Sequence, residues 1–179
     1  MTTPWSDADL GLLQDVYELQ SISMMNSIYY EKRLAVLQFY SFWMEVLTAA
    51  TASGSGLASV AQIQTEPGRS VWQALALIAA FVAIVRPIYA PGKKIEAYTR
   101  QKQGYHTNFF ALKKLARSIR YEAVVTADHR RRYDTAYDRH VQLSSEDESP
   151  ANKRVLIQAR KSAGEALPPA QFWWPPAEA

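Results

Sequence analysis

Two long apolar runs interrupt an otherwise mixed pattern of hydrophobic and polar positions. Residues 34–60 contain one formal charge, Glu45, and residues 70–90 also contain one, Arg86. A helix crosses the hydrocarbon core of a bilayer with about 20 residues, so each run is long enough to span it. Residues 61–69, between the runs, are mostly polar and include a Pro-Gly turn signal. The pattern predicts two transmembrane helices that an outer loop joins into an antiparallel hairpin.

Helical periodicity is also strong on both sides of the apolar runs. Residues 1–33 contain a helix N-cap pattern at Ser6, and no Pro or Gly interrupts the chain from Leu12 into the first run, which predicts one long helix. After the second run a Pro-Gly pair breaks the chain, and residues 91–166 predict further helices. Heptad spacing there indicates a helix core made of Tyr98, Tyr105, Phe109, Leu112 and Ile119. We therefore expect an all-α membrane protein, a two-helix transmembrane hairpin with a cytoplasmic antiparallel helical bundle.

Charge is distributed unevenly along the chain. In residues 1–33 five acidic side chains outnumber two basic ones, whereas in residues 91–179 sixteen basic side chains outnumber ten acidic ones, and the net charge of the chain is +3. Lys and Arg flank the two apolar runs, while the loop between them contains only Arg69. The positive-inside rule then predicts a multi-pass protein of the bacterial inner membrane with both termini in the cytoplasm. The acidic first helix is the expected packing partner of the basic helix that follows residue 91.

Glu45 and Arg86 are the candidate polar site within the predicted hairpin. They lie about equally far from the turn, so an antiparallel hairpin places them at a similar depth. A charge pair would offset much of the cost of burying either charge alone in a membrane. The alternative is that Arg86 extends toward the cytoplasmic headgroups while Glu45 is protonated or faces a neighbouring helix.

Small residues gather in the second half of the first run. Small side chains at four-residue spacing let helices approach closely, which favours a homo-oligomer or a pore wall. The alternative is that this helix packs only against its own hairpin partner. The residues expected to pack closely or to line a pore are Thr51, Ser53, Gly54, Ser55 and Gly56.

Residues that could support catalysis or bind a metal form no recognisable motif. The chain has no Cys, which excludes disulfide frameworks, Fe–S clusters and Cys-ligated zinc sites, and its three His residues fit no hydrolase or metalloprotease spacing. Asp134, Asp138 and His140 could be imagined as metal ligands, but pairing of Arg130 with Asp134 one helical turn away explains the cluster more simply. The sequence predicts neither an enzyme nor a bound metal or cofactor.

Two segments suggest partners. The basic residues between Lys93 and Arg120 suit anionic lipid of the bilayer or the acidic first helix, and no phosphate-binding loop or RNA-binding signature favours nucleic acid. The tail, residues 167–179, contains Phe172, Trp173 and Trp174 between two proline pairs. Such an anchor suits docking to a protein groove, to the bundle itself or to the membrane surface.

This arrangement resembles the SLATT family, two-transmembrane effector domains of bacterial nucleotide-signalling conflict systems. The resemblance covers residues 10–165 and rests on the order of the elements and on a basic helix that contains Tyr98, Tyr105, His106, Leu112 and Leu115. It implies a pore-forming effector that permeabilises the inner membrane in abortive-infection antiphage defence, gated by its cytoplasmic bundle and triggered by a sensor or regulator protein. Two alternatives remain open: a non-conducting membrane anchor that recruits a partner protein through its helices, and a soluble all-helical binding module.

Overall fold

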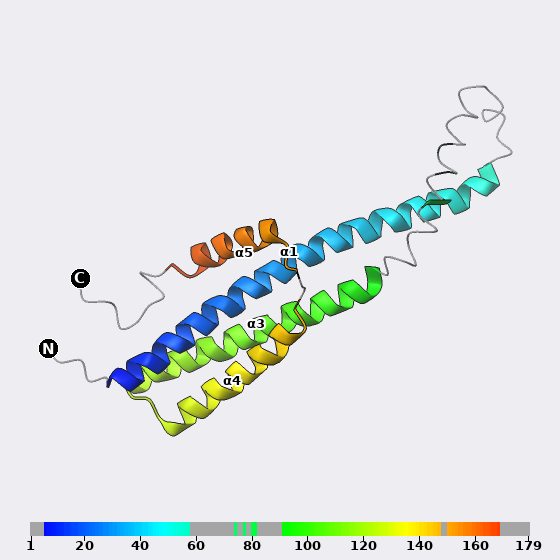
Figure 1. The fold of residues 1–179 in the computed structure, drawn as a ribbon. Helices are drawn as coiled ribbons and strands as arrows, with labels where there is room; N and C mark the ends of the chain where they lie inside the picture. Colours follow the sequence, from blue (N-terminus) through cyan, green and yellow to red (C-terminus); the bar gives the residue numbers. More distant parts are fainter. Residues whose placement is uncertain are drawn as a thin grey trace. The chain divides into compact units, whose positions relative to one another are not determined.

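The computed structural model describes residues 6–57, 74, 77, 80, 81, 91–147 and 150–168. These residues form helices and contain no strand (Figure 1). The helices are α1 (Asp7–Leu57), α3 (Pro91–Glu122), α4 (Ala127–Ser145) and α5 (Lys153–Ala166). The long uninterrupted helix that the first part of the sequence predicts is therefore present as α1.

The prediction of a transmembrane hairpin is wrong. Among the described residues, no helix combines the length and the apolar character that crossing a bilayer requires. In α1 the apolar run from residue 34 also contains Gln38, Glu45 and Thr48, and small polar residues follow them. These polar residues lower the mean hydropathy of the run. Of residues 70–90 only four are described. The assignments to a multi-pass inner-membrane topology and to a pore-forming role required this hairpin, and they are corrected with it.

The chain divides into two compact units. One unit, here called the bundle, comprises residues 1–33 and 98–179, and the other comprises residues 34–97. Within the bundle, α1 and α3 run antiparallel. Ser23 Oγ accepts a hydrogen bond from Asn108 Nδ2, and Arg33, later in α1, donates to the hydroxyl of Tyr98, which is earlier in α3. Figure 1 shows α4 alongside α3 and α5 alongside α1.

The apolar faces of α1 and α3 meet in the main core of the bundle. Residues recur there at three- and four-residue spacing, which places them on one side of each helix. Burying one such Leu, Ile or Val side chain contributes roughly 1.5–3 kcal/mol relative to leaving it in water. The buried members are Leu13, Val16, Tyr17, Leu19, Leu112, Leu115, Ala116, Ile119 and, from α4, Ala136. The acidic first helix and the basic third helix thus pack as the sequence predicts.

A second core cluster is built from tyrosines and closes on α5. Tyr30 and Tyr105 stack with ring centroids 6.0 Å apart, and Tyr29 meets Tyr30 edge-on at 5.2 Å. Ala159 of α5 is fully buried against this cluster. The Asn152 backbone N–H, at the N-cap of α5, donates to the Tyr29 hydroxyl at 3.0 Å. These contacts attach α5 to α1 and α3 at the tyrosine cluster.

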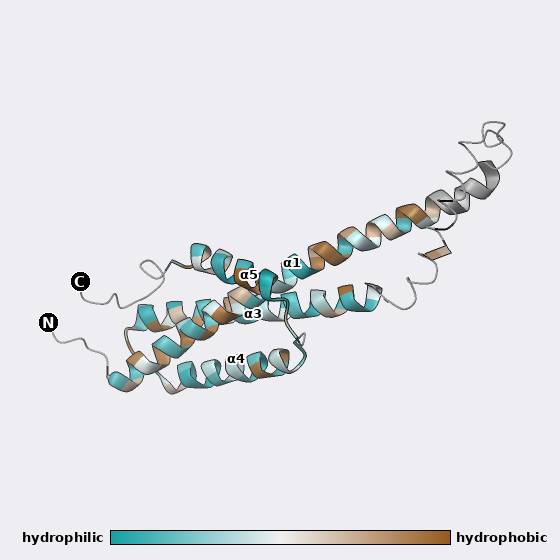
Figure 2. Ribbon diagram, turned by 45° about the horizontal axis from the view of Figure 1, so that its top comes forward, coloured by the Kyte–Doolittle hydropathy of each residue, from teal (hydrophilic) through white to brown (hydrophobic). Residues whose placement is uncertain are grey.

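The described residues of the other unit include a stretch of α1 with exposed apolar side chains. Phe39 is 61% exposed and Trp43 is 47% exposed, and their rings lie edge-on at 6.2 Å. Figure 2 shows apolar residues recurring along this part of the helix. Exposed rings of this size on one helix form an apolar surface.

Candidate functional site

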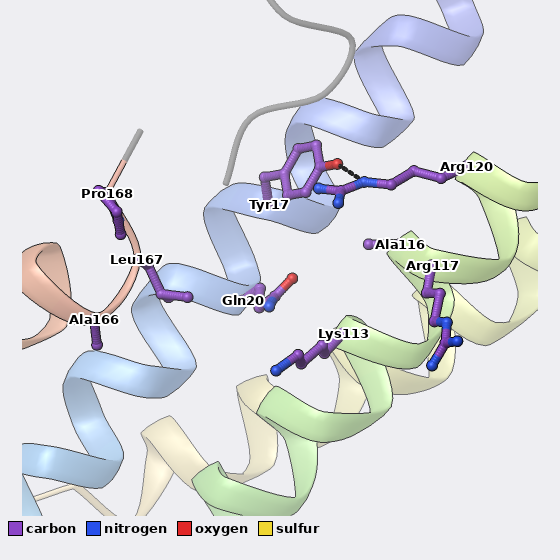
Figure 3. Close-up of a pocket in the computed structure, with 9 residues that line it drawn as sticks. All are labelled: Tyr17, Gln20, Lys113, Ala116, Arg117, Arg120, Ala166, Leu167 and Pro168. Carbon is purple, nitrogen blue, oxygen red and sulfur yellow. Dashed lines mark hydrogen bonds between the residues drawn. The ribbon is translucent and has the colours of Figure 1, made fainter. Parts of the chain in front are cut away.

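A pocket of about 460 Å³ lies between α1 and α3 at the C-terminal end of α5 (Figure 3). Tyr17, Gln20 and Ala116 are buried and form its inner wall. Three cationic side chains of α3 and the last residues of α5 form the rest of its lining, namely Lys113, Arg117, Arg120, Ala166, Leu167 and Pro168. Cavities of roughly 300–1,000 Å³ are the usual size of small-molecule sites.

The three cations share one face of α3 because of their spacing. Arg117 follows Lys113 by four residues and Arg120 follows Arg117 by three, and both intervals bring side chains to the same side of a helix. Figure 3 shows the side chains of Lys113 and Arg120 directed toward α1. Like charges at these spacings repel one another, so an anion placed among them would relieve that repulsion.

Arg120 is held in position by Tyr17. Its Nε donates to the Tyr17 hydroxyl at 2.6 Å, and its guanidinium carbon lies 5.1 Å from the centroid of the Tyr17 ring. Lys113 lies over the rings of Phe109 and Phe110 at 5.9 and 6.0 Å. Both cations are therefore braced by aromatic rings, a contact that leaves their charge intact.

Positive charge prevails among the described lining residues of the pocket. None of its described lining residues is acidic, and within the described part of the chain neither Lys113 nor Arg117 forms an ion pair with Asp or Glu. By contrast, Lys102 of the same helix pairs with Glu31 at 3.3 Å. The described lining of the pocket is consequently positively charged, and a concave surface of one charge attracts ions of the opposite charge.

Gln20 adds an unsatisfied polar group to the inner wall. Its side chain is 2% exposed, and its Oε1 atom is buried without a hydrogen-bond partner. A buried acceptor that has lost water and gained no partner destabilises a protein, and native structures contain few of them. The inner wall of the pocket thus contains a buried acceptor that has no hydrogen-bond partner.

A second polar cluster, of Ser118, Glu122 and His129, has the residue types of a hydrolytic triad but not its geometry. His129 is 2% exposed, and its Nδ1 accepts the Thr126 backbone N–H at 3.2 Å, so the ring proton lies on Nε2. Nε2 lies 3.2 Å from Ser118 Oγ, which itself donates to Glu122 at 2.9 Å. A histidine that donates to the serine cannot accept its proton. His129 instead forms, with Thr126, the capping box at the start of α4.

A third cluster surrounds Asp147 in the loop after α4. The Tyr30 hydroxyl donates to Asp147 Oδ1 at 2.8 Å, and the Tyr105 hydroxyl donates to the same carboxylate. Burial, reinforced by Asp147, raises the pKa of Tyr105 far above its ordinary value of 10.0. Burial also lowers the pKa of His140 below 6.5, partly opposed by Asp147. The two hydroxyls and the carboxylate form one hydrogen-bonded group that joins the loop after α4 to α1 and α3, which is a structural role.

The structure does not test the predicted pair of Glu45 and Arg86, because only one of the two residues is described. Glu45 lies on an exposed face of α1, and Arg86 lies outside the described residues, so their pairing stays a prediction. The small residues Thr51, Ser53, Gly54, Ser55 and Gly56 belong to α1, but their side chains are likewise outside the description. The same holds for the Trp-rich tail beyond Pro168.

The positions assigned to a helix core lie inside the bundle. Leu112 and Ile119 belong to the main core, Tyr105 belongs to the tyrosine cluster, and Phe109 is buried beside them. Tyr98 is partly buried, packs against the tyrosine cluster and meets the Tyr30 ring at 5.5 Å. The described residues contain no group of His, Asp and Glu able to hold a metal ion.

The pattern of the sequence does not predict the basic pocket. The excess of basic residues on α3 is readable from the sequence, but it favours anionic lipid or the acidic first helix as their partner. The interval from Lys113 to Arg120 could have indicated a cationic stripe, because helical spacing is readable from sequence. The end of α5 closes the pocket. Its position depends on tertiary packing, which no local sequence pattern predicts.

Comparison with protein-family models, with curated proteins and with solved structures found no match to this chain. The resemblance to the SLATT family is therefore not carried into the interpretation of the site.

Proposed function

We propose that this chain is a helical binding module, not an enzyme, and that its bundle holds an anionic ligand in the pocket between α1 and α3. The observation that carries the proposal is that Lys113, Arg117 and Arg120 line one pocket, whose described lining residues include no carboxylate. Guanidinium and ammonium groups bind anions by charge-assisted hydrogen bonds, which are about twice as strong as neutral ones.

The chemistry of the other polar clusters supports binding over catalysis. General base catalysis needs a group that accepts a proton from its substrate or nucleophile. His129 donates through Nε2, and the Tyr105 hydroxyl keeps its proton because burial raises its pKa. Neither cluster opens into the basic pocket, whose lining consists of cations, a carboxamide, a tyrosine and apolar residues.

The proposal retains one part of the expectations drawn from the sequence, namely that the helices of the bundle recognise a partner. It specifies that the ligand is anionic and that it binds in the pocket between α1 and α3. Self-association and a regulator protein stay predictions beside it.

Binding of methyl phosphate and of pyrophosphate to the full chain tests the proposal. Calorimetric titration at constant ionic strength measures affinity, because exposed cations attract anions less strongly as salt rises. The variant Lys113→Gln with Arg117→Gln should weaken binding at least about tenfold, equivalent to roughly 1.4 kcal/mol. Lys114→Gln is the matched control, since Lys114 is an exposed neighbour that does not line the pocket.

Two results would contradict the proposal. One is the absence of heat and of thermal stabilisation at millimolar concentrations of both anions. The other is an equal loss of affinity in the Lys114→Gln control, because it would show that the anions respond only to the general positive charge of α3.

A further inference from the structure

One exposed face of α3 combines cations with aromatic rings. The side chains of this face recur at three- and four-residue intervals, which brings them to the same side of the helix. The members are His106, Phe110, Lys113, Lys114, Arg117 and Tyr121, here called the α3 stripe, and all of them are exposed. An α-helix rises about 1.5 Å per residue, so the α3 stripe is roughly 22 Å long.

The cations of the α3 stripe have no acidic counterpart nearby in the helix. Residues 97–121 include neither Asp nor Glu. Within the described part of the chain the Lys and Arg side chains of the stripe form no ion pair, whereas an exposed cation of α4, Arg131, pairs with Asp128 at 2.7 Å. Figure 3 shows the Arg117 guanidinium directed away from Gln20. The stripe is therefore a surface on which positive charge accumulates, which attracts polyanions.

The order of side chains along the stripe selects among polyanions. Its two large hydrophobic groups, Phe110 and Tyr121, lie roughly 16 Å apart along the helix axis, with the Lys and Arg side chains between them. A helix that lies on a bilayer inserts a continuous apolar face, and a helix that docks on a protein uses apolar anchors on successive turns. A single strand of nucleic acid requires neither, because it is bound through its phosphates and through bases that stack on separate aromatic rings.

We infer that the α3 stripe binds single-stranded nucleic acid without sequence preference. Lys114 and Arg117 pair with phosphates, and the ring of Tyr121, which is 92% exposed, stacks on an unpaired base. The bases of a duplex are already stacked on one another, so a protruding ring favours a single strand. Stacking accepts every base because each has a flat π face, and this mode of binding therefore needs no base-reading sequence motif.

The inference goes beyond the proposed function and does not rest on it. The pocket lies between α3 and α1, and neither Lys114 nor Tyr121 lines it. The pocket and the stripe share Lys113 and Arg117, so the tests use the two residues that belong to the stripe alone. Binding of methyl phosphate in the pocket, or its absence, leaves the inference as it is.

Titration of a labelled oligothymidylate with the full chain tests the inference. A strand of about 16 nucleotides is long enough for a site of this kind, and the fluorescence anisotropy of its label reports binding. Each phosphate that a cation neutralises releases counterions, so the logarithm of the affinity should fall linearly with the logarithm of the salt concentration. The expected slope is about −2 for roughly three phosphate contacts.

Two variants with matched controls assign the binding to the stripe. Tyr121→Ala removes the stacking ring and should weaken binding about fivefold or more, whereas Tyr137→Ala, at a half-exposed position of α4, should change it by less than about twofold. Lys114→Glu should also weaken binding about fivefold or more, whereas Lys161→Glu makes the same charge change on α5 and should have less than about a twofold effect. The unfolding temperature of each variant checks that it is folded.

Three results would overturn the inference. The first is the absence of an anisotropy change at low salt and micromolar chain concentration, including the case in which vesicles of phosphatidylcholine and phosphatidylserine bind instead. The second is an equal loss of affinity in a variant and its control, because binding would then follow the net charge alone. The third is equal competition by polyglutamate of the same length, which carries negative charge but no bases and should compete at least about tenfold less well.

Discussion

Tyr105 and Asp147 lie 42 residues apart in the chain, yet the Tyr105 hydroxyl lies 2.9 Å from one oxygen of the Asp147 carboxylate and 3.0 Å from the other. The Tyr30 hydroxyl reaches the same carboxylate at 2.8 Å. One loop residue is thereby hydrogen-bonded to α1 and to α3. This contact fixes where the chain leaves α4 and sets the starting point of α5, whose far end closes the basic pocket.

Removing the Tyr105 hydroxyl should destabilise the bundle. In Tyr105→Phe the ring still fills its buried place, but Asp147 loses a charge-assisted hydrogen bond, so the free energy of unfolding should fall by about 1–2 kcal/mol. Urea unfolding monitored by circular dichroism measures the change. Tyr137→Phe, at a half-exposed position of α4, is the matched control and should change stability by less than about 0.5 kcal/mol. Equal effects of the two substitutions would show that the hydrogen bond to Asp147 adds nothing.

Mild acid should destabilise the bundle through His140. Burial holds the pKa of His140 below its ordinary 6.5, so between these two values the unfolded chain binds a proton that the folded chain does not. Stability therefore rises with pH in this window and is lost as pH falls below about 6.5, until the folded form also becomes protonated.

The variant His140→Gln checks this prediction. Glutamine cannot titrate, so the free energy of unfolding of the variant should vary less between pH 8 and pH 5 than that of the unmodified chain. The difference between the two isolates His140 from carboxylates, which are protonated mainly below this range. Parallel profiles for the two proteins would rule His140 out as the source of the acid sensitivity.

The pattern of apolar positions was sufficient to predict the helices and the pairing of α1 with α3. Leu112 and Ile119 recur at heptad spacing and are fully buried in the core. Lys102, which breaks the heptad pattern, forms an ion pair with Glu31. The spacing of apolar residues predicts the helices because a helix that buries one face needs apolar residues at every third or fourth position.

Length and low charge alone overpredicted the membrane hairpin. The run from residue 34 contains a single formal charge, but Gln38 and Thr48 also lower its apolar character. The contacts of Asp147 and the pocket escaped prediction for a different reason. Both join segments that lie far apart in sequence, such as Tyr30 and Asp147, and no residue spacing encodes them.

Gly104 should resist replacement because α3 and α4 approach closely there. A Cβ atom added at Gly104 would collide with the Leu143 side chain of α4. Gly104→Ala gains helix propensity of about 1 kcal/mol, but forcing a methyl group into a filled contact costs about 1–3 kcal/mol. We expect a lower unfolding temperature for Gly104→Ala and a higher one for the control Gly11→Ala, where no atom lies within 4 Å of the added carbon. Stabilisation by both substitutions would show that Leu143 moves aside at little cost.

Ala123, directly after α3, should be improved by glycine. Its φ angle of 52° lies in the left-handed region, where an L side chain is strained, and its N–H still donates to the Ile119 carbonyl at 3.0 Å. Glycine removes the strain but adds freedom to the unfolded chain, so Ala123→Gly should raise the free energy of unfolding by roughly 0.5–1 kcal/mol. The matched control is Ala111→Gly, at an exposed position within α3, where the same substitution should cost about 1 kcal/mol. If both substitutions destabilise equally, residue 123 behaves as an ordinary helical position, and the α3–α4 connection does not depend on a left-handed residue.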